Sequence, residues 1–513
     1  MLLGDVGVGK TTFIRRLVKI DAKQELERSL VFYIDFGSEP ALRRDLERYI
    51  AETFAKQLED QYGLDIYEDS FVRAVYNGEL NALAKGIYSR FRNTDPNRYM
   101  EKEIERLEEL TAKLETHLRR SFEHVRATEG RSAVVFFDNI DQREVEFQDA
   151  VYLVAQSMSG NWGLTTFVTL RPETFNTSRR SGSLAAYQPR VFTISPPQID
   201  QVVKKRLRFA QSTIEAGSFS LGADGVTLDS SLLRDYIAVL IFSLTRNPDL
   251  CECLDNVSAG NVRRALDLLT SFVGSGHVDT EKILGAWRES SRYIIPLHEF
   301  LRAIIYGDSE FYDPASSPVP NAYDISSRNP REHFAMPILL NYLHRQAQRG
   351  AVELGFVLLA KVYDHFQSLG FTIEDIEYTI DRSVETGLIE SSVGAASDRP
   401  KGAERLRLRQ GGAYLLRRLL RQFVYYDAVV VDTPILSDTV RPLMTSAGFI
   451  MDRLDRADRF LNYLVAQFEV FDSLDTGLDY GDIAAAARAD ISIARSRVLR
   501  AEEMRQRKAE SSR

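Results

Sequence analysis

A chain of 513 residues is long enough to form about three domains. Its net charge of −8 gives no overall attraction to nucleic acid, and its two cysteines, Cys251 and Cys253, cannot form a disulfide framework and lack the spacing of a zinc site. Because there is no apolar run of about 18 residues and no signal-peptide pattern, we expect a cytoplasmic protein without a membrane partner.

A complete phosphate-binding motif, G-x-x-x-x-G-K-[ST], lies close to the first residue, where residues 4–12 read GDVGVGKTT. In such a loop, backbone N–H groups at the start of the following helix surround the phosphates of a nucleotide. Apolar residues from Phe13 to Ile20 have the helical spacing that the motif requires. The motif therefore predicts an ATP site formed by Gly4, Asp5, Val6, Gly7, Val8, Gly9, Lys10, Thr11 and Thr12.

Within this loop, Lys10 and Thr11 are the residues with side-chain chemistry. We expect Lys10 to reach the β- and γ-phosphates of ATP, and the Thr11 hydroxyl to ligate Mg²⁺. Only Met1 to Leu3 precede the loop, whereas a strand usually has about five or six residues. We therefore expect the chain to be N-terminally truncated.

Residues 29–37 (SLVFYIDFG) have the pattern of a second core strand. They are followed by a helical insertion at about 40–128, in which the apolar spacing from Glu101 to Arg126 predicts one amphipathic helix that packs on a neighbour; alternatively, this helix forms a coiled coil with a partner.

The second strong motif is an apolar run, Ala133 to Phe137, that leads directly into Asp138-Asn139-Ile140-Asp141. Such a run is typical of a buried parallel strand, and catalytic groups gather where parallel strands end. We expect Asp138 to hold Mg²⁺. The adjacent Asn139 cannot act as a base, so Asp141 is the nearest substitute for orienting the attacking water; alternatively, Asp141 caps the following helix. The missing carboxylate predicts slow hydrolysis.

Two further strands complete the predicted sheet. Residues 165–170 (TTFVTL) lead into Arg171, which we expect to lie beside the γ-phosphate and to report hydrolysis to the rest of the molecule. Residues 190–195 form the last short strand, which is followed by an amphipathic helix.

In this order, the loop GDVGVGKTT, the strand ends FFDNID and TLRPET, and the helical segment GNVRRALDLL at residues 260–269 resemble the AAA+ and STAND branch of P-loop NTPases. The last segment is similar to the sensor-2 helix of clamp-loader and origin-recognition-type AAA+ proteins, in which the first arginine contacts the nucleotide from the lid. That arginine is Arg263 here. Arg171 matches the sensor-1 position, and the spacing of Asp138 and Asp141 resembles the NACHT and KAP variants. The resemblance covers roughly residues 1–280.

This resemblance implies a head-to-tail homo-oligomer through the ATPase domain, in which an arginine finger from one subunit completes the site of the next. Arg179, Arg180 and Arg190 lie where such fingers usually occur, and the sequence does not select among them. In STAND proteins, by contrast, the nucleotide stays locked within one chain until a trigger is sensed.

The segment 351–426 has the order of a winged helix-turn-helix: helices at 351–370 and 372–387, strands at 388–392 and 405–409, and a helix at 412–423. The helix that would read DNA is acidic, with Arg382 as its one cation, so DNA phosphates would repel it. Arg405, Arg407 and Arg409 on the wing could grip phosphates without sequence specificity; alternatively, they are solvated surface residues.

We therefore expect an α/β P-loop ATPase core at 1–200, a helical lid at 201–293, a connector at 294–350, the winged helix-turn-helix at 351–426, and a helical C-terminal region with a basic tail at 427–513. The predicted function is that of an ATP-binding, slowly hydrolysing AAA+/STAND-like switch in bacterial defence or regulation. A DNA-associated AAA+ loader of replication type and a non-hydrolysing nucleotide-binding scaffold are the alternatives.

Overall fold

The computed structural model describes residues 1–37, 46–172, 174–175, 178, 189–216, 230–349, 355–392, 404–444 and 449–511. The chain forms two compact units, Met1–Ser195 (the first unit) and Pro196–Arg513 (the second unit). None of the described helices is both long and apolar enough to span a membrane.

The first unit alternates strands and helices. Its described elements are, in chain order, β1 (Leu2–Leu3), α1 (Lys10–Arg16), the π-helical segment η1 (Leu17–Asp21), α2 (Lys23–Leu26), β2 (Ser29–Asp35), α3 (Leu46–Tyr62), α4 (Asp69–Val75), α5 (Asn77–Lys85), α6 (Phe91–Thr94), α7 (Pro96–Thr111), α8 (Leu114–Glu129), β3 (Ser132–Asp138), η2 (Ile140–Gln142), α9 (Val145–Asn161), β4 (Thr165–Leu170) and β5 (Phe192–Thr193). The predicted strands at 29–37, 133–137, 165–170 and 190–195 are confirmed.

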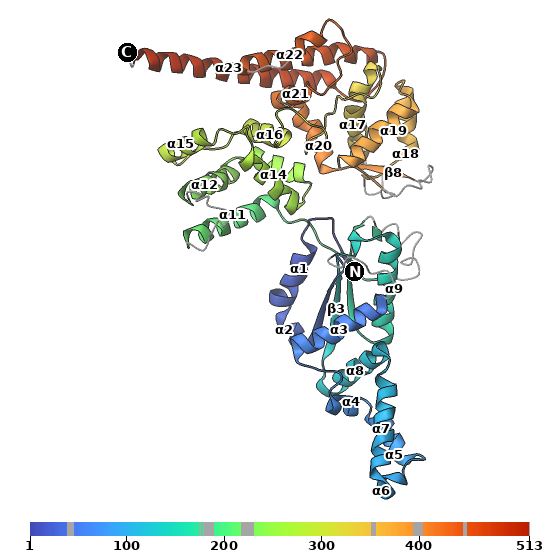
Figure 1. The fold of residues 1–513 in the computed structure, drawn as a ribbon. Helices are drawn as coiled ribbons and strands as arrows, with labels where there is room; N and C mark the ends of the chain where they lie inside the picture. The colour runs from blue at the N-terminus through green and yellow to red at the C-terminus, as the bar shows by residue number, and fades with distance from the viewer. Residues whose placement is uncertain are drawn as a thin grey trace. The chain divides into compact units, whose positions relative to one another are not determined.

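Among the described residues, five strands form one parallel sheet in the order β2-β3-β4-β1-β5. Because β1, β4 and β3 are neighbouring parallel strands, their carboxyl ends lie at the same edge of the sheet. Helices α3, α8 and α9 cover one face, and α1 and α2 cover the other (Figure 1). Phe32, Phe54 and Phe122 pack at the centre of the first face, whereas Ile14 and Phe136 belong to the smaller cluster on the second.

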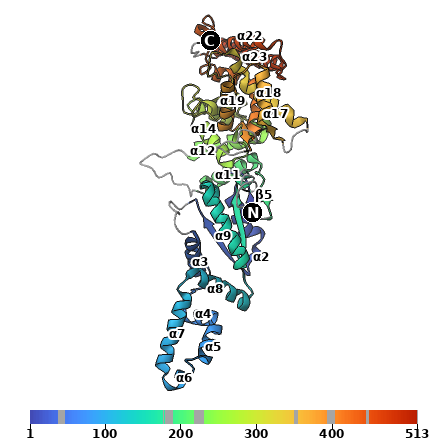
Figure 2. The same cartoon turned by 90° about the vertical axis from the view of Figure 1, so that its right-hand side faces the viewer.

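The insertion differs from its prediction. One helix was expected from Glu101 to Arg126, but the chain breaks at Ala112 and Lys113 into α7 and α8. The continuous apolar spacing concealed the break because each helix uses its own part of the pattern. Leu107 packs in a small cluster with Val72 and Tyr76, and Leu118, Phe122 and Val125 pack against the sheet. In Figures 1 and 2, α5, α6 and α7 extend away from the sheet.

The second unit is mostly helical. Its described elements are α11 (Ile199–Glu215), α12 (Ser230–Arg246), α13 (Pro248–Ser258), α14 (Val262–Gly274), α15 (Thr280–Ser290), α16 (Leu297–Tyr306), η4 (Pro330–Phe334), α17 (Ala335–Gln348), β6 (Val357–Leu358), α18 (Leu359–Ser368), α19 (Ile373–Glu385), β7 (Ile389–Ser391), β8 (Arg405–Leu408), α20 (Gln410–Arg417), η6 (Leu419–Arg421), α21 (Phe423–Val429), η7 (Arg441–Met444), α22 (Ile450–Phe468), η8 (Glu469–Phe471) and α23 (Tyr480–Ser511).

Strands β6, β8 and β7 form an antiparallel sheet beside α18 and α19, which is the topology of a winged helix-turn-helix. The helix expected from 351 is wrong in its first part, because residues 357–358 form β6 and α18 begins at Leu359. Gly355 has φ +79°, which a right-handed helix excludes. Residues 351–354 lie outside the described part of the chain.

The Pro- and Ser-rich segment between α16 and η4 is packed into the core of the second unit. Val319, Ala322 and Tyr323 are buried, and the Tyr323 hydroxyl lies 2.9 Å from that of Tyr426 on α21. This irregular segment therefore packs between helices and is not an exposed linker.

Candidate nucleotide-binding site

The phosphate loop joins β1 to α1 at the carboxyl edge of the sheet. The Gly4 N–H donates to the Leu170 carbonyl at the end of β4 (3.2 Å), which fixes the start of the loop. Gly9 precedes α1 with φ +92°, a conformation that strongly favours glycine. A Cβ at Gly4 would lie 2.9 Å from Val8 Cγ2, so a side chain there would disturb the loop.

Lys10 is folded back into this loop. Its ammonium donates to the carbonyl oxygens of Gly4 (2.7 Å) and Asp5 (3.3 Å) and to Asp141 Oδ2 (3.1 Å), and the residue is only 7% exposed. A buried ammonium needs such acceptors. Phosphate oxygens of a bound nucleotide could replace them one for one.

Asp138, at the end of β3, is fully buried and is held by hydrogen bonds from uncharged groups. Its Oδ2 accepts from the hydroxyls of Thr11 and Tyr33, both at 2.6 Å. Its Oδ1 accepts from the Thr169 hydroxyl (2.9 Å) and the Asn139 N–H (3.0 Å). A buried carboxylate needs such donors, because a polar group without partners in the interior costs free energy.

Tyr33 and Thr169 were not predicted as site residues. Burial, followed by the hydrogen bond to Asp138, raises the pKa of Tyr33, so its phenol remains a donor to the carboxylate. Both residues lie near the carboxyl ends of strands that flank β3. The signal that could have found them is a hydroxyl side chain within two residues of the end of a strand next to the Walker B strand.

Asp141 lies on η2 and links two predicted site residues from different elements. Its Oδ2 accepts from Lys10 Nζ and from Arg171 Nε, each at 3.1 Å, and its side chain is 6% exposed. The alternative that Asp141 caps the following helix is wrong, because Glu144 occupies the position before α9. The structure therefore brings Lys10, Asp141 and Arg171 together in one charged cluster.

Asn139 has a left-handed backbone, with φ 57° and ψ 25°. Its side-chain amide donates to Asp35 Oδ1 at 2.7 Å, and the Gly37 N–H donates to the same oxygen at 2.9 Å. Asp35 ends β2 and is the register partner of Asp138 in the parallel ladder. A carboxylate that was not predicted therefore lies at the same edge of the sheet.

The donor set fits Mg²⁺. Mg²⁺ prefers oxygen ligands and commonly takes only one or two from the protein, with water and phosphate oxygens completing the shell. The Thr11 hydroxyl and the Asp138 carboxylate already meet beside the phosphate loop, so these two residues would hold the ion. Among the described residues, no group of three or more His, Cys, Asp or Glu side chains suits a metal, so an all-protein metal cage is absent there.

The predicted arginines of the lid and of the finger region are either exposed or outside the described residues. Arg263 is exposed at the start of α14 in the second unit, whereas Arg264 donates to the Pro318 carbonyl (3.1 Å), and burial lowers its pKa. Arg190 is exposed, and its carbonyl accepts from the Met1 amine at 2.6 Å. Arg179 and Arg180 lie outside the described residues.

The arginines of the wing are held by a carboxylate of their own sheet. Arg407 and Arg409 on and after β8 both donate to Glu390 on β7, and Arg407 also lies over the Phe356 ring, 4.5 Å from its centroid. Arg405 is half-buried on the same strand. These charges are therefore already engaged within the winged helix.

The helix that would read DNA, α19, also contacts its own chain. Tyr378 and Arg382 both donate to Asp324 in the segment before η4, with the tyrosine bond at 3.1 Å. Asp375 is buried in a capping box with Thr372 at the start of the helix. Part of this helix is thus covered within the second unit.

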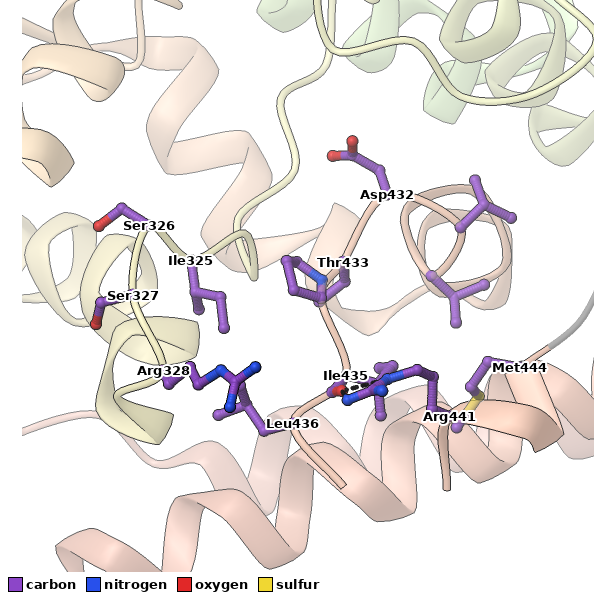
Figure 3. A pocket seen from close by; sticks show the side chains of 13 residues that line it. Ile325, Ser326, Ser327, Arg328, Asp432, Thr433, Ile435, Leu436, Arg441 and Met444 are labelled. Atoms are coloured by element: carbon purple, nitrogen blue, oxygen red, sulfur yellow. Dashed lines mark hydrogen bonds between the residues drawn. The ribbon is translucent and has the colours of Figure 1, made fainter. Parts of the chain in front are cut away.

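A cavity of about 690 Å³ lies in the second unit, between residues 325–328 and 430–444 (Figure 3). Arg328 and Arg441 point toward one another from opposite walls, and Arg441 Nε donates to the Ile435 carbonyl at 3.1 Å. The residues that line this cavity all belong to the second unit, whereas the phosphate-binding motif belongs to the first.

No family model matches the chain, and no curated protein matches its sequence. Among solved structures, Cdc6p from Pyrobaculum aerophilum is similar over 84% of this chain and 88% of its own, with 12% identity and a TM-score of 0.28. The Aeropyrum pernix ORC2 protein in its ADP form covers 80% and 82%, with 12% identity and a TM-score of 0.35. The Aeropyrum pernix ORC1 protein in complex with DNA covers the same shares, with 16% identity and a TM-score of 0.26. Similarity at these values does not by itself assign a family.

Proposed function

We propose that this protein is an AAA+-type ATPase that binds ATP with Mg²⁺ at the carboxyl edge of its parallel sheet and switches conformation as the nucleotide is bound and hydrolysed. The observation that carries the proposal is the joining of three separate motifs at one edge: Lys10 and Thr11 from the loop, Asp138 and Asp141 from the end of β3, and Arg171 from the end of β4.

Each residue has a role in this proposal that follows from its position. Lys10 and Arg171 would leave Asp141 and neutralise the phosphate charge that develops during hydrolysis. Thr11 and Asp138 would hold Mg²⁺, which supplies further charge neutralisation on the phosphates. Arg263 would contact the nucleotide from the lid, as the resemblance of its helix implies. A homo-oligomer through the ATPase core, with Arg190 among its finger candidates, belongs to the same proposal.

A DNA-associated ATPase is the second candidate function. The winged-helix topology of the second unit favours it, and Aeropyrum pernix ORC1 was solved in complex with DNA. The engaged arginines of the wing and the covered face of α19 favour the first candidate, a switch with a different trigger. Both candidates require the same nucleotide site, so one experiment tests the site and separates them.

The test measures ATP hydrolysis with and without duplex DNA, with particle mass followed by light scattering in the same samples. Lys10→Ala is compared with wild type and with Lys19→Ala, which removes an exposed lysine from the same helical run. We expect Lys10→Ala to lower hydrolysis by about a hundredfold or more, because it removes a charge that stabilises the transition state. Lys19→Ala should stay within about twofold.

The outcomes have distinct meanings. Equal rates in wild type and Lys10→Ala would contradict the proposed site. Tight, Lys10-dependent ATP binding without hydrolysis would leave a nucleotide-binding scaffold. If DNA raises a Lys10-dependent rate and enlarges the particle, the DNA-associated function is correct; if DNA changes neither, the protein is a switch with another trigger.

A further inference from the structure

The cavity of the second unit has the size of a small-molecule site. Its volume of about 690 Å³ lies within the range of about 300–1,000 Å³ that is usual for ligand pockets. Three segments form its walls: residues 325–328 before η4, residues 430–436 after α21, and the 3-10 turn η7. The proposed nucleotide chemistry uses none of these residues, so the cavity raises a separate question of what it binds.

Hydrogen bonds within the second unit hold two of these walls in place. Glu332 Oε2 accepts from the N–H groups of Ser326 (2.7 Å) and Ser327 (3.1 Å). The Leu436 N–H donates to the Tyr463 hydroxyl at 3.0 Å. A site whose walls are fixed before a ligand arrives loses little conformational entropy on binding. The cavity therefore has the preorganisation of a binding site.

Two arginines extend into the cavity from different walls, and Figure 3 shows Arg328 and Arg441 pointing toward one another. Arg441 donates to the Ile435 carbonyl through Nε (3.1 Å) and Nη2 (3.0 Å). It also pairs with Asp438 at 3.1 Å, but that carboxylate is 90% exposed and water screens the pair. The Arg328 side chain makes no hydrogen bond or ion pair with the described residues. Facing cations repel one another, and an anion between them would remove that repulsion.

The described lining offers no carboxylate for the space between the two arginines. Asp432 is its one acidic residue, and Figure 3 shows the carboxylate pointing away from both Arg328 and Arg441. Its Oδ2 accepts from Asn321 Nδ2 at 3.0 Å, which holds it in that direction. The position between the arginines is therefore open to an anion from solution. Guanidinium groups match the geometry of carboxylate and phosphate oxygens.

Much of the remaining lining is apolar. Ile325, Ile435 and Met444 are buried hydrophobic residues, and Leu436 is half-buried in the same lining. Inorganic phosphate alone would leave these surfaces in contact with water, whereas an anion with an apolar part would cover them. The chemistry of the lining thus favours an organic anion.

We propose that this cavity binds a small organic anion, whose carboxylate or phosphate group is held between Arg328 and Arg441 and whose apolar part lies against Ile325, Ile435 and Met444. The binding is non-covalent. The proposal goes beyond the proposed ATPase function and does not depend on it, because the lining belongs to the second unit and the phosphate-binding motif to the first.

The test measures binding of anilinonaphthalene sulfonate (ANS), an organic anion that fluoresces in apolar surroundings, to the full chain. Arg328→Gln is compared with Arg459→Gln, which removes an exposed arginine from α22 in the same unit. We expect Arg328→Gln to raise the Kd for ANS by about tenfold, because it removes a charged hydrogen-bond donor. Arg459→Gln should stay within about twofold of wild type, as is usual for an exposed position.

Competition against ANS identifies the chemistry of the ligand. Benzoate and phenyl phosphate carry the two anionic groups on the same ring, benzyl alcohol has no charge, and inorganic phosphate has no apolar part. We expect benzoate, phenyl phosphate or both to displace ANS at concentrations at least about tenfold lower than the other two compounds require. The more effective anion identifies the group that the arginines bind. Equal displacement by benzyl alcohol, or by inorganic phosphate, would overturn the proposal.

A second variant separates recognition from folding. Arg328→Lys keeps the positive charge and should recover part of the affinity that Arg328→Gln loses, with thermal unfolding measured for both. Equal Kd values for wild type and Arg328→Gln, or for Arg328→Lys and a weakened Arg328→Gln, would refute the role of this charge. Lys10→Ala should bind ANS as wild type does. Failure of the ATPase proposal is therefore recognised separately, from the hydrolysis rates of wild type and Lys10→Ala.

Discussion

The phosphate-loop edge and the wing contain the same charge arrangement in different surroundings. At the edge, Lys10 and Arg171 share Asp141, whose side chain is 6% exposed. On the wing, Arg407 and Arg409 share Glu390, whose side chain is 11% exposed. Only the first cluster adjoins a glycine-rich loop that can admit a polyanion. We call the Lys10–Asp141–Arg171 cluster the latch, because the phosphates of a nucleotide would displace its carboxylate. We call the Arg407–Glu390–Arg409 cluster the tie, because it joins β8 to the neighbouring strand β7.

Of these three tests, the largest effect is expected for the hydrogen bonds that hold the buried Asp138 near the latch. Thr169→Val removes one of the donors to the buried Asp138 and should lower the free energy of unfolding of the first unit by about 2 kcal/mol. Urea unfolding can be followed through Trp162 in a Trp287→Phe background, which leaves one tryptophan as reporter. Thr166→Val on the same strand is the control, because its hydroxyl makes only a long bond of 3.4 Å. Equal losses in the two variants would show that Asp138 does not depend on Thr169.

The latch itself is tested by Asp141→Asn. Lys10 donates to Asp141 and would have to leave it to bind phosphate, after which the carboxylate would remain close to the phosphates. Removing its charge should tighten binding of a fluorescent ATP analogue by about tenfold, or 1.4 kcal/mol. Hydrolysis should stay within about tenfold of wild type. A fall in kcat of about a hundredfold with unchanged affinity would instead support the prediction that Asp141 orients the attacking water.

The smallest effect is expected when the tie on the wing is weakened. Glu390→Gln weakens the hold on Arg407 and Arg409 and should raise the affinity for a labelled DNA duplex by about threefold at low salt, with a steeper salt dependence. Fluorescence anisotropy measures both quantities. Asp364→Asn on α18 makes the same change in net charge at an exposed position. If the two variants bind DNA equally, the wing arginines do not contact phosphates, and the tie is purely structural.

Much of the fold follows from the sequence because the core strands have local signatures. The apolar run of β3 and the alternating burial of β2 depend on residues within each strand, so the predicted strands and the winged-helix order were confirmed. The division into α7 and α8 was not predictable, because apolar spacing is the same for one long helix and for two that pack separately. The strand β6 was missed since two residues carry no periodic signal.

The site was predictable only where one segment carries its own motif. The loop residues and Asp138 follow from contiguous sequence, and their roles stay predictions. Tyr33, Thr169 and Asp35 come from other strands, and their approach to the end of β3 depends on strand order and register. Counting charged residues in the sequence has a related limit, because a count does not show which charges pair across strands. A count of arginines on the wing does not reveal that Glu390, more than ten positions away in sequence, is bonded to two of them.

The left-handed backbone of Asn139 has a consequence for how this site can evolve. Most side chains pay about 1–2 kcal/mol in that conformation, whereas glycine, asparagine and aspartate adopt it readily. Glutamate is therefore a poor replacement there, and aspartate is the one acidic residue that the turn accepts without rebuilding. A single nucleotide change converts an asparagine codon into an aspartate codon. Lineages of this protein could thus gain a second acidic group beside Asp138 in one step, and the rate of the proposed ATP hydrolysis could change without altering the fold.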